Sequence, residues 1–98
     1  MKSNTFTVKK IMMQYGVTLE IVSGLASCTM VDAYEALHPQ YFRLCPLIMI
    51  ARVRRAVENE LYERGWNGRG ERLWTEYDAS LERYLRGRRI APKRRLRT

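Results

Sequence analysis

Seven positively charged side chains lie within the last thirteen residues of this chain, and no acidic residue lies among them. They are Arg86, Arg88, Arg89, Lys93, Arg94, Arg95 and Arg97. Arginine and lysine bind phosphate groups and release the counterions around them, so this segment has the chemistry of a polyanion-binding surface. Because like charges repel and cannot be buried together, the pattern predicts a flexible basic tail over residues 87–98. The alternative is a tail that only keeps the chain soluble.

The remainder of the chain is close to neutral. The 98 residues include 18 Lys+Arg and 10 Asp+Glu, which gives a net charge of +8 at pH 7. Seven of those charges belong to the last thirteen residues, so about +1 remains for residues 1–85. Within that part, the arginines that we expect to add phosphate contacts are Arg52, Arg54, Arg55 and Arg69. A basic excess of this kind points to an anionic partner, most often a nucleic acid.

The residue types present do not suggest a catalytic site or a metal site. Two cysteines and one histidine cannot complete a four-ligand metal site. No set of nucleophile, base and orienting residue can be assembled, and the glycine-rich segment Gly65–Gly70 lacks the Lys-Ser/Thr that completes a phosphate-binding loop. We therefore expect neither an enzyme nor a metal or other cofactor.

Hydrophobic periodicity predicts an all-α fold. The expected helices are Val8–Gln14, Leu19–Ala26, Thr29–Leu37, Pro46–Arg64 and Glu71–Arg86. The turn at Gly65–Gly70 should fold the last two helices into an antiparallel hairpin. The sequence thus predicts a small bundle of four or five helices, with an N-terminal helix pair and a C-terminal hairpin, as one domain over residues 1–86 followed by the tail.

Local signals support the proposed helix ends. Thr18 and Thr29 precede apolar runs and can accept a backbone hydrogen bond as N-caps. Pro46 suits the first turn of a helix. Within the long fourth helix, two four-residue spacings, Arg54–Glu58 and Glu60–Arg64, predict ion pairs on its outer side.

The segment from residue 18 to residue 37 has the pattern of two short helices that cross at a tight turn. Ser23, Ala26 and Ala33 supply the small side chains that a close crossing needs. This segment resembles the helix-turn-helix of small DNA-binding regulators from phages and plasmids. The resemblance implies that the second helix enters the major groove and that the protein is a homodimer. The residues that would face the groove are Thr29, Met30 and Tyr34.

Two other interpretations of the N-terminal half stay open. The segment Thr29–Glu35 contains no Arg, Lys, Asn or Gln, the residues that usually read bases, so the helix pair can equally be part of the core. The chain start also resembles ribbon-helix-helix repressors, in which Phe6 and Val8 would lie on a strand. Lys9 and Lys10 would then reach the groove.

Together these patterns predict a small regulatory protein that binds DNA or RNA, with DNA favoured. The alternative is a phage- or plasmid-encoded inhibitor or adaptor that binds a host protein complex. It is motivated by Ile11–Phe42, which contains no Lys or Arg, together with the apolar run Leu44–Ala51. The two segments give more apolar surface than a domain this small can easily bury. Leu44–Ala51 is far shorter than the roughly 20 residues that span a bilayer, so we expect no membrane association. The sequence shows no export signal, so we expect a cytoplasmic protein.

Overall fold

The computed structural model describes residues 7–97, and the side chains of residues 7–87. Its elements are α1 (Thr7–Gln14), α2 (Leu19–Ala26), α3 (Met30–Ala36), the 3₁₀ helix η1 (Pro39–Leu44), α4 (Leu47–Glu63), α5 (Gly70–Leu73) and α6 (Thr75–Arg97). No strand occurs between residues 7 and 97. The predicted all-α fold is therefore confirmed.

The two predicted N-caps are present. The Thr18 hydroxyl accepts a hydrogen bond from the Ile21 amide at 3.2 Å, and the Thr29 hydroxyl accepts one from the Asp32 amide at 3.0 Å. Between the two helices, Ser27 adopts a left-handed conformation with φ of 55°, which ends α2 within one residue. Such a cap satisfies backbone groups that a helix end leaves unpaired, so these local residues fix where α2 and α3 meet.

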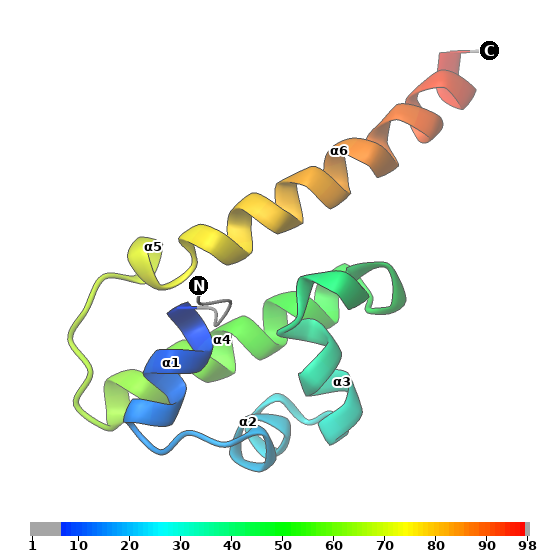
Figure 1. Ribbon diagram of the computed structural model, residues 1–98. Helices are drawn as coiled ribbons and strands as arrows, with labels where there is room; N and C mark the ends of the chain where they lie inside the picture. Colours follow the sequence, from blue (N-terminus) through cyan, green and yellow to red (C-terminus); the bar gives the residue numbers. More distant parts are fainter. Residues whose placement is uncertain (1–6, 98) are drawn as a thin grey trace.

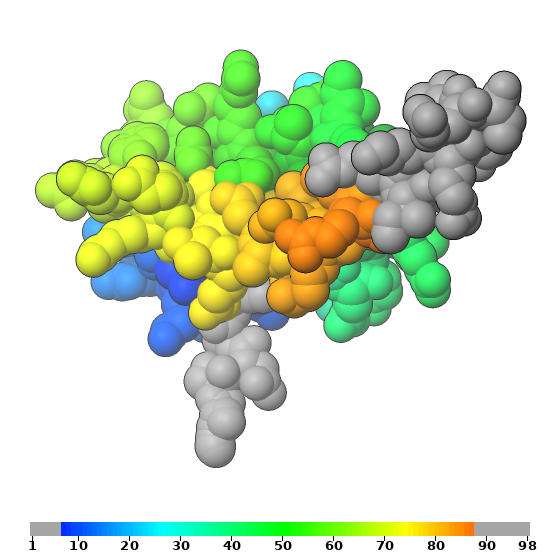
Figure 2. Space-filling model, turned by 90° about the horizontal axis from the view of Figure 1, so that it is seen from above, coloured from blue at the N-terminus to red at the C-terminus, as the bar shows by residue number. Residues whose placement is uncertain are grey.

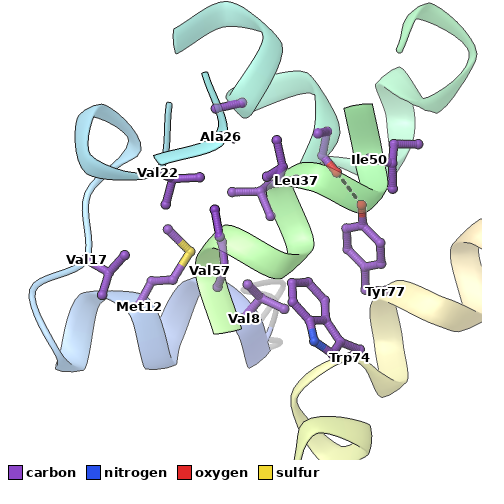
Figure 3. Packing of buried hydrophobic residues seen from close by; sticks show 14 of the residues in the cluster. Val8, Met12, Val17, Val22, Ala26, Leu37, Ile50, Val57, Trp74 and Tyr77 are labelled. Atoms are coloured by element: carbon purple, nitrogen blue, oxygen red, sulfur yellow. Dashed lines mark hydrogen bonds between the residues drawn. The ribbon is translucent and has the colours of Figure 1, made fainter. Parts of the chain in front are cut away.

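The core surrounds α4, which runs through the middle of the molecule (Figure 1). Its buried stripe is formed by Ile50, Val53, Ala56, Val57 and Leu61. Figure 3 shows side chains from α1, α2, α3 and α6 converging on this stripe. The apolar residues at helical spacing in each segment thus share one core.

Side-chain contacts hold α4 against the start of α6. Arg54 forms an ion pair with Asp78 at 2.8 Å, and its guanidinium lies 4.5 Å from the centre of the Trp74 ring. Trp74 Nε1 donates to the Glu58 carboxylate at 2.5 Å. The predicted Arg54–Glu58 pair is therefore wrong, because both partners turn to the C-terminal helices instead. The predicted Glu60–Arg64 pair is confirmed at 2.7 Å.

Three elements differ from the sequence-based prediction. The segment Pro39–Leu44, expected as a connection, forms η1, because Pro39 begins a tight turn and Phe42 is buried under α6. The last predicted helix is divided at Trp74 into α5 and α6, and α6 continues to Arg97 instead of ending at Arg86. Val8 and the two lysines after it lie on α1, so a ribbon-helix-helix strand there is wrong. Phe6 lies outside the described residues.

Candidate nucleic-acid interface

The basic end of α6, which we define as residues 86–97, extends beyond the other helices (Figure 1). Glu82 is the last acidic residue of α6, and every charged residue after it is positive. Six predicted contact residues, Arg88, Arg89, Lys93, Arg94, Arg95 and Arg97, lie outside the described side chains. They nevertheless belong to the same helix as the residues that anchor it to the core. Figure 2 shows the described part of α6 lying across one face of the body.

Arg86 is the one residue of the basic end whose side-chain position is described. Its guanidinium forms an ion pair with Glu82 at 3.0 Å, and both side chains are about two-thirds exposed. An exposed ion pair of this kind contributes only a few tenths of a kcal/mol. Arg86 can therefore exchange this carboxylate for a phosphate group at little cost.

Arg52, predicted as a phosphate contact, binds its own backbone. Its Nη2 atom donates to the carbonyl oxygen of Ala26 at 2.6 Å and to that of Ser27 at 3.3 Å. These carbonyls lie at the C-terminal end of α2, where the helix dipole favours a cation. Arg52 thus holds α2 on α4, and this role competes with binding an external phosphate.

Arg54, Arg55 and Arg69 lie in three different environments. Arg54 is committed to Asp78 and to the faces of Trp74 and Tyr77, and its side chain is only 28% exposed. Arg55 is exposed on the outer side of α4. Arg69 is 75% exposed and forms a weak contact with Glu71 at 3.4 Å. Arg54 and Arg55 line one hollow between α4 and α6, whereas Arg69 lines another beside α1 and α5.

Arg64 was expected only as the ion-pair partner of Glu60, yet it also ties the end of α1 to α4. Its Nη1 atom donates to the carbonyl oxygens of Tyr15 and Gly16 at 3.1 and 3.2 Å. Gly16 has φ of 71°, which ends α1 and turns its carbonyl toward the arginine. The two partners lie nearly fifty residues apart in the sequence, so no local spacing could have revealed this contact.

The α2–α3 pair crosses closely, as the helix-turn-helix resemblance requires. Ser23, Ala26 and Ala33 are buried at the crossing. The three residues expected to face a groove are all exposed: the N-cap Thr29, and Met30 and Tyr34 of α3. The outer face of α3 is thus open to solvent, but it is apolar and acidic rather than basic.

Two buried groups of the body, the Cys45 thiol and the Tyr77 hydroxyl, have raised pKa values. Burial raises the pKa of the Cys45 thiol to about 11, and the carboxylates of Asp32 and Glu35 act in the same direction. Burial also raises the pKa of Tyr77, whose hydroxyl donates to the carbonyl oxygen of Ala36. A thiol and a phenol with raised pKa values stay protonated at neutral pH and are poor nucleophiles.

Residues 7–87 contain no group of three or more His, Cys, Asp or Glu side chains that could hold a metal ion. In the part of the chain that the structure describes, no helix combines the length and apolar character needed to cross a bilayer.

Comparison with known proteins identifies no relative. The chain matches no protein-family model, and neither the curated proteins nor the solved structures contain a significant match to it.

Proposed function

We propose that this chain is a small regulatory protein that binds nucleic acid, DNA in particular, through the basic end of α6. The observation that carries the proposal is the separation of charge between the body and this helix end. Arg52, Arg54 and Arg64 of the body have partners within the chain. The seven cations from Arg86 onward follow the last acidic residue of α6.

Phosphate neutralisation is the interaction that such a segment performs best. A cation that displaces condensed counterions from a nucleic acid contributes affinity that does not depend on base sequence. The basic end therefore supplies affinity, and specificity must come from elsewhere. The exposed face of α3 offers no cation for base reading, so the proposal does not depend on a helix-turn-helix.

The test compares two quadruple variants that lose the same amount of charge at different places. In the first, four residues of the basic end, Lys93, Arg94, Arg95 and Arg97, are replaced by Gln. In the matched control, four exposed cations outside the basic end, Lys10, Arg43, Arg72 and Arg83, are replaced by Gln. Both variants have a net charge reduced from +8 to +4.

Fluorescence anisotropy with a labelled duplex measures the affinity of each variant at about 100 mM salt. We expect the basic-end variant to lose at least about ten-fold in affinity, and the control less than about three-fold. Equal losses in the two variants would show that net charge alone matters and would overturn the assignment to α6. A single-stranded RNA of the same length, measured in parallel, decides between the two nucleic acids.

A second candidate, a protein-binding adaptor, is favoured by one observation. Leu44, Leu47 and Ile48 are exposed at the end of η1 and the start of α4. Leu47 also lines a hollow of about 380 Å³ between α4 and α6, together with Ile50 and Leu81. Exposed apolar residues beside a cavity are typical of a partner site. Nuclease treatment during purification separates the candidates, because a nucleic-acid binder loses its companion and an adaptor keeps it.

A further inference from the structure

The surface formed by α1 and α3 contains two neighbouring hollows. The larger, of about 460 Å³, lies between α1 and α3 and is floored by the buried residues Met12, Val17 and Leu37. The smaller, of about 350 Å³, lies along the outer side of α3. Leu19 and Tyr34 line both hollows, so the two form one continuous apolar surface.

Tyr34, the shared wall, is held in place from below. Its ring stacks on that of His38 with 3.9 Å between the centroids, and Tyr41 lies 5.9 Å away. The Nδ1 atom of His38 is 2.7 Å from the Tyr34 carbonyl oxygen. A wall that is already ordered loses little side-chain entropy when a partner packs against it.

Each hollow is bordered by exposed apolar residues and by one charged residue, and the two charges are opposite. On α1, Met13 is 75% exposed, and Lys9 lies four residues before it. On α3, Val31 is 64% exposed, and Glu35 lies four residues after it. Residues four apart on a helix lie on the same face. Within the described residues, neither Lys9 nor Glu35 has an ion-pair partner.

This arrangement is complementary to itself. We consider a second copy placed about a two-fold axis near Tyr34, with α1 of one copy against α3 of the other. Lys9 then lies opposite Glu35, and Met13 lies opposite Val31. The two-fold axis repeats both contacts, as an isologous interface requires.

We propose that the α1–α3 surface is the interface of a homodimer. The occupant of both hollows is a second copy of this chain. The charges on the surface are of both signs and lie on opposite sides of an apolar centre, so they match a copy of themselves. A polyanion would be repelled by the Glu35 side of the same surface. This inference does not rest on nucleic-acid binding by α6.

The decisive experiment uses charge reversal at the two bordering residues. Sedimentation velocity at about 150 mM salt measures the dimer fraction of the full chain as its concentration rises. We expect the unchanged protein to dimerise, and Lys9→Glu and Glu35→Lys each to weaken dimerisation at least about ten-fold. An equimolar mixture of the two variants should dimerise again, because each mixed pair then has opposite charges at both contacts.

Two controls keep the result specific. Lys10→Glu makes the same charge change one residue along α1, but Lys10 lines neither hollow, so dimerisation should change less than about three-fold. Val31→Glu places a charge in the apolar centre of the proposed interface and should abolish dimerisation. Because Val31 is exposed in the single chain, the circular dichroism spectrum should stay unchanged. A monomeric unchanged protein, or a mixture of the two variants that associates no better than either alone, would overturn the proposal.

Discussion

The N-terminal and C-terminal parts of this protein carry charge in opposite ways. The surface of α1 and α3 has Lys9 and Glu35 on either side of an apolar centre. The basic end of α6 has seven cations and no acid. A surface with both signs can recognise a copy of itself, whereas a surface with one sign repels its copy and needs a partner of opposite charge. The two regions therefore call for different partners.

The largest effect is expected from a substitution that removes the packing of α6 against α4, which joins the two regions. Trp74 is buried where α5 meets α6, and it contacts both Arg54 and Glu58 of α4. We expect Trp74→Ala to lower the free energy of unfolding by about 3–5 kcal/mol, because it leaves a cavity and removes the donor to Glu58. Urea unfolding followed by circular dichroism measures this loss. The exposed Tyr62→Ala is the control, and a loss below about 1 kcal/mol for Trp74→Ala would contradict the packing described.

A smaller effect distinguishes structural arginines from those of the basic end. Arg64→Met removes the hydrogen bonds to the carbonyl oxygens of Tyr15 and Gly16, and we expect a loss of about 1–3 kcal/mol in unfolding free energy. Arg94→Met should leave unfolding unchanged and weaken duplex binding. Measuring both properties for both variants checks the contrast. Equal stabilities of the two variants would mean that Arg64 does not hold α1 on α4.

The smallest effect concerns pH. Burial raises the pKa of Cys45 from about 9 to about 11, so between these values the folded chain binds more protons than the unfolded chain. The contribution of Cys45 to the free energy of unfolding is therefore fully present below pH 9 and is lost as the pH rises toward 11. At pH 10 the loss is on the order of 1 kcal/mol. Urea unfolding at pH 7 and pH 10 measures the difference. Cys45→Ala should reduce it, and an unchanged pH dependence in that variant would refute the assignment to Cys45.

The sequence predicted the fold where the signals are local. Thr18 and Thr29 marked the starts of α2 and α3 because an N-cap acts within three residues. The contacts of Arg52 and Arg64 could not be predicted, because their carbonyl partners lie 26 and 49 residues away in the sequence. The same is true of Arg54, which forms its ion pair with Asp78 of α6 and not with Glu58, four residues along α4.

The candidate sites divide in the same way. The basic end of α6 could be found from the sequence alone, because its seven cations lie within thirteen residues that contain no acid. The surface of α1 and α3 could not, because its residues come from two helices that only the fold brings together. Met30 and Tyr34 were singled out in the sequence as groove-facing residues, and the structure places both beside the smaller hollow.

The most direct test of the account is the salt dependence of duplex binding by the full chain. If all seven cations of the basic end contact phosphates, a plot of log affinity against log salt has a slope of about −6. We expect a slope between about −3 and −6, and a much flatter slope when Lys93, Arg94, Arg95 and Arg97 are replaced by Gln. A slope near zero for the unchanged chain would contradict the assignment of polyanion binding to α6.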